Sequence, residues 1–395
     1  MAADPSTAAA RPPVRTITVG VPLESLDDPR PLERALADLA AARRRFADAG
    51  WEVQTVRAAL PPLLAGVSRE ARAAAIGALR RIDALARNAA ALVSIGPVLR
   101  EDREVSGLTD WAVDLVDATE SLFFSVEVAR GATVRRGAAS TAAAIVRALG
   151  TTQPQGLANF RFAAAAGVPA GTPFFPVAFH EGPPSLAIAL ESAAIVGESC
   201  REIAEGRDTA DASATLAHAL EQIIQPAARI GEACAHVTGR TWLGVDPSPA
   251  PGLDRSIGAA IETLSGVPFG APGTLDACAT ITGGLKAIAQ RTCGYAGLML
   301  PVLEDVVLAR RAIERRFSVR DLLSFSAVCG TGLDVVPLPG DIEQDELARL
   351  ITDVAALSAR LGKPLSARLL PVPGVRAGEP VSFDNPLLAD CIALS

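Results

Sequence analysis

Short apolar stretches alternate with long amphipathic ones along this 395-residue chain, and this alternation constrains the fold most. It predicts a mostly parallel sheet covered by helices, because extended and helical periods keep replacing one another. The expected strands are 16–22, 51–60, 91–98, 121–130, 157–164, 185–192, the start of 241–251, 294–300, 325–338 and 364–373. The expected helices are 30–50, 68–88, 138–149, 194–206, 210–237, 254–265, 273–290, 303–315 and 342–361.

A sheet of about ten strands favours closure, because a closed β/α barrel leaves no strand edge unpaired. An open doubly wound sheet is the alternative. No Gly-rich dinucleotide fingerprint follows the first strand, so the sequence shows no nucleotide cofactor motif. We expect residues 1–14, which are rich in small residues and proline, to form a flexible N-terminal arm. Residues 15–395 are expected to form a single α/β barrel domain with its helices outside.

The stretch 121–130 has two different faces. Its even-numbered positions from 122 to 128 are apolar, whereas Ser125 and Glu127 fall on the opposite face. In a barrel the apolar face would lie under helices and Glu127 would point toward the lumen, where it could contact a substrate. The alternative is a strand near a sheet edge with one solvated face.

Composition excludes several classes of partner. The net charge of −7 argues against nucleic acid or an anionic membrane surface as the main partner. No apolar run reaches the length of a membrane span, and the first 15 residues lack the apolar core of a signal peptide. The six cysteines form no Cys-x-x-Cys pair and lie in apolar surroundings, which is typical of free thiols in a reducing cytoplasm.

The segment 159–185 is unusually rich in phenylalanine and proline and contains adjacent titratable residues. We predict that His180 is a general acid or base, with Glu181 orienting it indirectly. Arg161, together with Asn159, is predicted to hold a substrate carboxylate. The alternative roles are structural: His180 would cap a turn, and Arg161 would pair with a buried acid.

The segment 328–341 runs from an apolar stretch into a glycine turn. Gly330 and Gly332 would let the backbone approach a ligand closely, and Asp334 follows them. Asp334, Asp246 and Glu304 are the candidates for binding a divalent metal ion, although no ligand spacing demands one.

Several stretches, taken in order, resemble a family known as domain of unknown function 711. The stretches are "TPFFPVAFHEG" (172–182), "DPSPAPG" (246–252), "FGAPGT" (269–274), "LMLPVLEDVVL" (298–308), "VCGTGLDVVPLPGD" (328–341) and "LLPVPGVRAGEPVSFDNPLL" (369–388). The resemblance covers most of the chain after about residue 15 and implies an α/β barrel related to glycyl-radical enzymes such as pyruvate formate-lyase. It implies no established activity. Departures such as Cys-Gly-Thr-Gly-Leu-Asp, where many members have Cys-Ser-Val-Gly-Leu-Asp, indicate a divergent subfamily of specialised metabolism.

Arg291, Gly294 and Tyr295 stand at the Arg-x-x-Gly-Tyr spacing that carries the radical in glycyl-radical enzymes. Such an enzyme also needs a cysteine at the barrel centre, and 172–182, the candidate central loop, contains none. The stretch also lies about a hundred residues before the C-terminus. We therefore expect tight packing at Gly294 and Gly297, with Tyr295 near the lumen at a substrate, and no radical chemistry.

These observations predict a cytoplasmic, non-radical enzyme of the lyase, aldolase or isomerase type. It would perform acid–base chemistry on a small metabolite with a carbonyl or carboxylate group, bound in the barrel lumen. The alternative is a non-catalytic protein on the same barrel that binds a small anion or takes part in an assembly. Assembly as a homo-oligomer stays open in either case.

Overall fold

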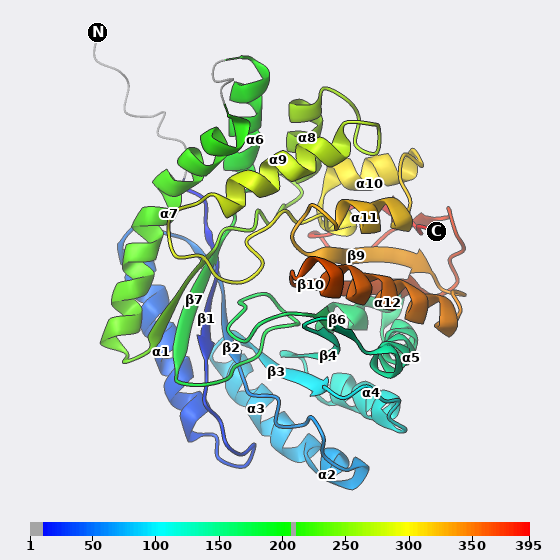
Figure 1. The fold of residues 1–395 in the computed structure, drawn as a ribbon. Helices are drawn as coiled ribbons and strands as arrows, with labels where there is room; N and C mark the ends of the chain where they lie inside the picture. The colour runs from blue at the N-terminus through cyan, green and yellow to red at the C-terminus, as the bar shows by residue number, and fades with distance from the viewer. Residues whose placement is uncertain (1–10, 207–210) are drawn as a thin grey trace.

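The structure, a computed structural model, describes residues 11–206 and 211–395 (Figure 1). Its centre is one large sheet in the order β8-β7-β1-β2-β3-β4-β6-β10-β9, with β5 paired to β4. The strands of this sheet are β1 Val14–Gly20, β2 Val53–Ala59, β3 Ala91–Leu99, β4 Leu122–Arg130, β5 Thr133–Val134, β6 Phe162–Ala166, β7 Ser185–Leu190, β8 Thr241–Asp246, β9 Gly332–Pro339 and β10 Leu365–Val372. A separate two-stranded sheet joins β11 Pro380–Val381 to β12 Cys391–Ile392.

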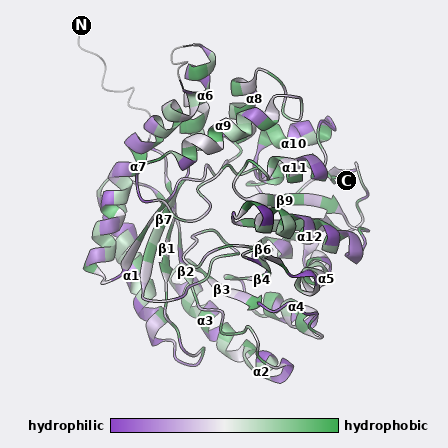
Figure 2. Ribbon diagram, in the orientation of Figure 1, coloured by the Kyte–Doolittle hydropathy of each residue, from purple (hydrophilic) through white to green (hydrophobic). Residues whose placement is uncertain are grey.

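Helices surround the sheet, as Figure 1 shows. They are α1 Arg30–Asp48, α2 Arg69–Ala74, α3 Ile76–Asn88, α4 Leu108–Ala118, α5 Arg136–Thr152, α6 Ala193–Ala204, α7 Ala212–Val237, α8 Ile257–Ser265, α9 Thr274–Lys286, α10 Val306–Ile313, α11 Val319–Phe325 and α12 Gln344–Leu361, with 3₁₀ turns η2 Pro154–Arg161 and η3 Val302–Glu304. Their ribbons are striped purple and green in Figure 2, as expected for amphipathic helices. In α1, for example, Leu32, Leu39 and Phe46 are buried against the sheet side. Among the described helices, none has both the length and the apolar character that crossing a bilayer requires.

The mostly parallel sheet predicted from the alternation is confirmed. Strands β1 to β4 and β6 run parallel to one another, as do β7 with β8 and β9 with β10. These three blocks meet at the antiparallel pairs β1–β7 and β6–β10. Strand β4 lies between β3 and β6 and both its faces are buried, so the alternative of a strand with a solvated face was wrong.

The strand predicted at 294–300 is absent, and the chain there is irregular. This segment nevertheless links the two ends of the strand order. Val245 of β8 makes a parallel bridge with Thr292, and Asp334 of β9 makes one with Pro301. The amide of Gly330 also donates to the carbonyl of Leu298 at 2.9 Å. Left-handed backbone at Gly294 (φ 69°) and Ala296 (φ 44°) interrupts the extended conformation that a regular strand needs.

The connection between β6 and β7, residues 167–184, passes among the strands and is called the central loop below (Figure 1). Phe175, Val177 and Phe179 are each at most 5% exposed. The hydroxyl of Ser94 on β3 donates to the carbonyl of Ala178 at 2.6 Å. The loop is therefore part of the interior and not a surface excursion.

The structure differs from the expectations in further places. Residues 157–161 of the predicted strand 157–164 belong to the 3₁₀ turn η2, and the strand begins at Phe162. Helices α4, Leu108–Ala118, and α11, Val319–Phe325, were not predicted, and the strand expected at 325–338 begins only at Gly332. Residues 1–10 of the predicted arm lie outside the described residues, and residues 11–14 are not loose, because Val14 begins β1 and the carbonyl of Pro13 accepts from Glu191.

Candidate functional site

A cavity of about 120 Å³ lies where the central loop meets the strands. Seven strands, the loop and the segment after β8 contribute to its walls. The residues that line it are Arg15, Thr16, Arg57, Leu92, Phe123, Pro173, Phe174, Phe175, Ala189, Leu190, Asp246, Ser248, Ala250, Met299, Glu304 and Arg368. The walls thus combine a large apolar surface with a few charged side chains, which is typical of sites for small molecules.

Three arginines converge on this cavity from separate strands: Arg15 on β1, Arg57 on β2 and Arg368 on β10. Arg57 donates from Nε to the hydroxyl of Thr55 at 3.2 Å. Within residues 11–206 and 211–395, its two terminal nitrogens have no hydrogen bond or ion pair. Burial, reinforced by repulsion from Arg15 and Arg368, lowers the pKa of Arg57 to about 9. An anion in the cavity would relieve this repulsion.

The other two arginines are already engaged with carboxylates. Arg368 donates from Nε to Asp334 at 2.8 Å and lies 3.5 Å from Glu304. Arg15 lies 3.9 Å from Glu304, at the outer limit of an ion pair. Burial raises the pKa of Asp334 despite the nearby Arg368, and its Oδ2 has no hydrogen-bond partner within the described part of the chain. Arg57 is therefore the arginine of the three whose charge is left for a ligand.

The central loop supplies an aromatic support for these arginines. The guanidinium of Arg57 lies 5.1 Å from the ring centre of Phe175, and that of Arg368 lies 5.6 Å from Phe174 and 5.5 Å from Phe160. A guanidinium above an aromatic face is attracted by the ring quadrupole and loses freedom to rotate. Phe174 and Phe175, which are adjacent in the central loop, thus hold Arg368 of β10 and Arg57 of β2.

Asp246, at the end of β8, accepts hydrogen bonds from four donors. It accepts from the amide and hydroxyl of Ser248 at 3.0 and 2.5 Å, and from the amides of Tyr295 and Ala296 at 3.2 Å each. Burial raises the pKa of Asp246, although these hydrogen bonds oppose the shift. A Cβ at Gly294 would lie 2.1 Å from Oδ2 of Asp246, so the glycine is required for this close approach.

The cavity brings together part of the predicted site. Asp246 and Glu304 line it, Asp334 adjoins it through Arg368, and Tyr295 is buried with its ring edge-on to Phe174 at 5.2 Å. The tight packing expected at Gly294 and Gly297 is confirmed, since a Cβ on Gly297 would lie 2.4 Å from a backbone atom of Gly330.

Gly330 and Gly332 approach other backbone rather than the cavity. An added Cβ on Gly330 would lie 2.3 Å from Gly297 Cα, and one on Gly332 would lie 2.3 Å from the carbonyl oxygen of Ser366. Their predicted role beside a ligand stays a prediction, and the contacts here are those of packing.

His180 is not among the residues that line the cavity. Its Nε2 lies 2.9 Å from the carbonyl oxygen of Gly182, its amide donates to Leu60, and its ring packs against Gly20. Burial lowers the pKa of His180. Glu181 is half-exposed and pairs with Arg100 at 2.7 Å. These contacts resemble the turn-capping alternative, and the predicted catalytic role stays a prediction.

Arg161 is enclosed by the end of α4. It donates to the carbonyls of Leu122, Val116 and Thr119 and to the hydroxyl of Thr119, at 2.5 to 3.1 Å. These four hydrogen bonds engage the guanidinium group, and those at the end of α4 satisfy carbonyls that have no partner within the helix. Asn159 donates to Val146 at 3.0 Å. The structure therefore gives both residues structural partners and places neither in the wall of the cavity.

Glu127 does face inward, but toward a different cluster. It pairs with Arg100, Arg130 and Arg135 at 3.0, 3.0 and 2.6 Å. The three arginines surround one carboxylate. Through these ion pairs Glu127 helps to hold the ends of β3 and β4 together.

The three metal candidates do not converge on a common point. Within the described residues, no group of three or more histidines, cysteines, aspartates and glutamates is placed to hold a metal ion. Asp246 instead accepts from hydroxyl and amide donors, and Asp334 and Glu304 pair with Arg368.

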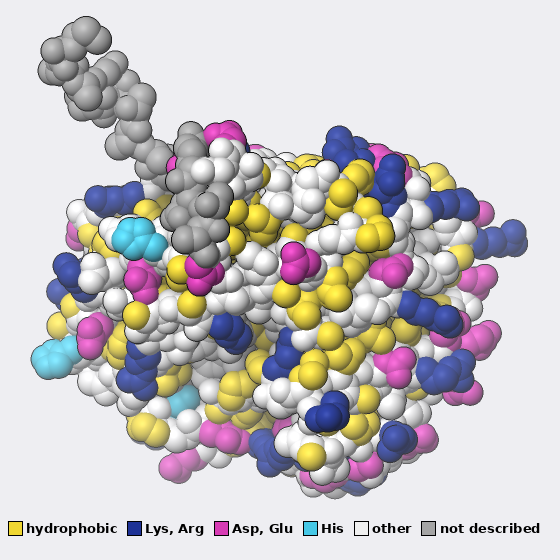
Figure 3. Space-filling model, turned by 45° about the horizontal axis from the view of Figure 1, so that its top comes forward, with side chains coloured by type: hydrophobic (Ala, Val, Ile, Leu, Met, Phe, Trp, Pro, Cys, Tyr) yellow, Lys and Arg dark blue, Asp and Glu magenta, His cyan; other side chains and the backbone are white. Residues whose placement is uncertain are grey.

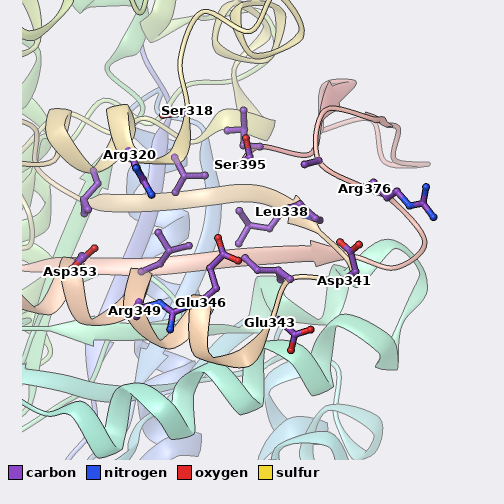
Figure 4. Close-up of a pocket in the computed structure, with 17 residues that line it drawn as sticks. Ser318, Arg320, Leu338, Asp341, Glu343, Glu346, Arg349, Asp353, Arg376 and Ser395 are labelled. Atoms are coloured by element: carbon purple, nitrogen blue, oxygen red, sulfur yellow. The ribbon is translucent and has the colours of Figure 1, made fainter.

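A second, larger depression of about 1020 Å³ lies at the surface between α11, α12 and the C-terminal residue Ser395. Figure 4 shows its charged side chains spread along the groove, with Arg320, Arg349 and Arg376 interspersed among acids. These groups do not converge on one point, and their elements lie outside the sheet. The internal cavity is therefore the better candidate site.

Apolar side chains on the surface are scattered. Figure 3 shows them on one face in several groups separated by charged residues. The large exposed ones are spread over α7, α9, α10, α12 and the chain after β11: Val237, Leu275, Val306, Ile313, Leu361 and Leu387. Nothing on this face singles out one contiguous interface, and assembly as a homo-oligomer stays a prediction.

The sequence reasoning missed Arg15, Arg57, Arg368 and Ser248 as site residues. A signal was present, because each arginine is the one charged residue in its stretch of strand, in "VRTITV", "TVRAA" and "SARLL". A charged residue in a buried strand has to find a partner or a ligand inside.

The fold and the cavity together define an α/β protein with an arginine-lined internal site. The chain belongs to the family described as Uncharacterised ACR (DUF711), whose model matches residues 8–384. The predicted family is thus confirmed.

Related proteins carry the name UPF0210 protein. One from Pyrobaculum islandicum is 34% identical over 385 residues, which cover 92% of this chain and 83% of that protein. One from Pyrobaculum arsenaticum is 37% identical over 231 residues, covering 55% and 51%. One from Desulforudis audaxviator is 31% identical over 282 residues, covering 67% and 61%. The match therefore spans about half the length of the second relative and most of the first.

Proposed function

We propose that this protein binds a small anionic metabolite, with a carboxylate beside a carbonyl or similar group, in the arginine-lined cavity and catalyses acid–base chemistry on it. The observation that carries the proposal is Arg57: a cation inside the sheet, supported by Phe175, without an ion-pair partner among the described residues. A planar guanidinium can hold a carboxylate by two parallel hydrogen bonds. The volume of about 120 Å³ limits the ligand to a small molecule, since drug-sized pockets are roughly 300–1,000 Å³.

Asp246 is the group we propose for proton transfer. It lines the cavity together with Arg57, and burial raises its pKa above the ordinary value of a carboxyl group, which favours a role in proton transfer. Its Oδ1 accepts three of the four hydrogen bonds, so Oδ2, with one, retains room for a proton. Ser248 would keep the carboxyl group oriented toward the ligand. A lyase, aldolase or isomerase step needs a group of this kind beside an anchored carboxylate.

We also propose that the segment 291–301 closes the sheet into a barrel. Its bridges to β8 and β9 and the close approach of Gly297 to Gly330 support closure. The cavity would then be the lumen, and the central loop would cross it. No step of the proposed chemistry uses a radical, and the tight packing of Gly294 against Asp246 is sufficient reason for a glycine there.

Free thiols support the proposal of a reducing, cytoplasmic location. All six cysteines are unpaired, and five of them are buried. Burial raises the pKa of Cys200 and Cys391 to about 12, so these thiols are inert core groups.

The second candidate is a binding protein without catalysis, and the donors around Asp246 favour it. A carboxylate that accepts four hydrogen bonds can be a structural element that fixes the turn after β8. In that case the cavity would hold an anion and release it unchanged.

The test separates binding from turnover. Native protein is screened for thermal stabilisation by small keto, hydroxy and enol carboxylates, in parallel with Arg57→Gln and with Arg229→Gln, a control on the exposed face of α7. We expect stabilisation that Arg57→Gln abolishes and Arg229→Gln retains. Each stabilising compound is then incubated with protein and followed by NMR for proton exchange or conversion. Loss of exchange in Asp246→Asn would support the enzyme, whereas binding without exchange in the native protein would support the second candidate.

A further inference from the structure

The ion pairs around the cavity leave one of its three arginines without a carboxylate partner. Arg15, Arg57 and Arg368 contribute three positive charges, whereas Glu304 and Asp334 contribute two negative ones at ion-pair distance from Arg15 and Arg368. Asp246 is not an ion-pair partner of these arginines, because its oxygens face the donors of Ser248, Tyr295 and Ala296. One positive charge, that of Arg57, is left over.

Apart from Thr16, Asp246 and Ser248, the rest of the wall is apolar. Phe123, Phe174, Phe175 and Met299 line the cavity with Leu92 and Leu190. A second charged group on a ligand would have to leave water and face these side chains, or compete with Glu304 for Arg15 and Arg368. Burying a charge without a partner costs far more than burying a hydrocarbon of the same size.

We propose that the ligand is a singly charged carboxylate with a short apolar body, and that Glu304 selects against dianions such as dicarboxylates and phosphate. This inference rests on the proposed function and names the substrate class of the same site. The carboxylate would pair with Arg57, and the body would lie against the phenylalanines of the central loop and of β4. Glu304 occupies the place at Arg15 and Arg368 that a second anionic group would need, so it acts as a specificity residue.

Calorimetric titration with four probes of similar size tests the inference: butyrate, its neutral isostere butyramide, the dianion succinate, and inorganic phosphate, all at one fixed ionic strength. We expect butyrate to bind native protein at least about tenfold more tightly than succinate or phosphate, and butyramide not to bind. Arg57→Gln should lose butyrate binding, and Arg229→Gln should keep it.

The decisive variant is Glu304→Gln, which preserves size and removes one negative charge. It leaves two of the three arginine charges without an ion-pair partner, so succinate should gain at least about tenfold in affinity and overtake butyrate. The control is Glu343→Gln, whose side chain is 79% exposed and pairs with Arg147 at 3.7 Å outside the cavity. Melting temperatures of all variants show that each is folded before its titration is interpreted.

The outcomes separate the two proposals. Tighter binding of succinate or phosphate than of butyrate by native protein, still dependent on Arg57, would overturn this inference and leave the proposed anion site standing. An unchanged preference in folded Glu304→Gln would also overturn it. If none of the probes binds in a manner that depends on Arg57, both the inference and the proposed function fall.

Discussion

Arg57 of β2 stacks on Phe175 of the central loop, with 5.1 Å between the guanidinium carbon and the ring centre. The two residues are far apart in the sequence and meet because the loop returns among the strands. Phe175 also packs against Phe123 of β4, with ring centres 5.4 Å apart. The orientation of Arg57 is therefore set by aromatic contacts that run from Phe175 of the loop to Phe123 of β4.

The stacking predicts unequal effects of two similar substitutions. Phe175→Leu removes the ring under Arg57, and we expect ligand affinity to fall about threefold to thirtyfold, because a cation–π contact contributes roughly 0.5–2 kcal/mol. Phe123→Leu removes a ring from the same wall without an arginine above it and should weaken binding less than threefold. Titration of a ligand identified in the screen, carried out on folded variants, measures both. Equal losses would mean that apolar contact, and not arginine orientation, is what Phe175 contributes.

The contact between Gly297 and Gly330 predicts a large stability effect. Gly330→Ala places a methyl group 2.3 Å from Gly297 Cα, and backbone cannot move aside as a side chain can. We expect a loss near the upper end of the usual cost of overpacking, about 3 kcal/mol. Chemical unfolding measures it.

Gly197→Ala in α6 is the matched control, because nothing lies within 4 Å of the added methyl group. It should stabilise the protein by about 0.5–1 kcal/mol, as alanine does in place of glycine inside a helix. A Gly330→Ala variant as stable as the native protein would show that the segment 291–301 does not hold the ends of the sheet together tightly.

Most of the sheet and its helices could be predicted from sequence because the signals are local. In α1, for instance, the apolar positions recur with helical period and Gly50 ends the run. The segment 294–300 misled the same reasoning, since it is as apolar as a strand but contains glycines whose role is set by Asp246 and Gly330, which are distant in sequence. Local pattern cannot show which backbone a glycine approaches.

The candidate site was predicted only in part for a similar reason. Asp246, Glu304 and Asp334 were identified as candidate metal ligands, and the structure brings them to one region. The arginines beside them could not be placed, because Arg15 and Arg57 lie on the neighbouring strands β1 and β2 whereas Arg368 lies on β10, beyond β3, β4 and β6. His180 attracted attention because histidine titrates near neutral pH, but its burial and its contact with Gly182 depend on a loop path that residue type does not encode.

His180→Gln separates the structural role of this residue from the predicted catalytic one. The ring nitrogen beside the Gly182 carbonyl lies in a buried turn, so we expect a loss of roughly 1–3 kcal/mol in the free energy of unfolding, with ligand binding by the folded protein retained. His218→Gln, at an exposed position of α7, should change neither quantity. Melting temperature and rate are measured on the same preparation. A His180→Gln protein of native stability that binds ligand but has lost turnover would restore the catalytic role.

Asp246 predicts a pH dependence whose sign can be worked out. Burial raises the folded-state pKa of Asp246 above its unfolded value, so the folded protein holds this proton more tightly than the unfolded chain does. The stabilisation associated with the proton is fully present below the unfolded pKa of about 3.9 and is lost as pH rises through the folded pKa. Asp246→Asn cannot ionise. It should carry a constant penalty of about 1–3 kcal/mol for lost hydrogen bonds, but not this pH-dependent loss.

The difference in stability between native protein and Asp246→Asn should therefore be largest near pH 4 and should shrink toward pH 8. The total change is about 1.4 kcal/mol for every tenfold difference in proton affinity between the folded and unfolded states. Scanning calorimetry at a series of pH values measures it, with Asp276→Asn, an exposed carboxylate on α9, as the control whose difference should stay flat. A difference that grows with pH would mean that the four donors around Asp246 outweigh its burial. The carboxyl group would then be a fixed anion, and the binding protein without catalysis would become the better description, because a group that holds no proton near neutral pH is a poor general acid.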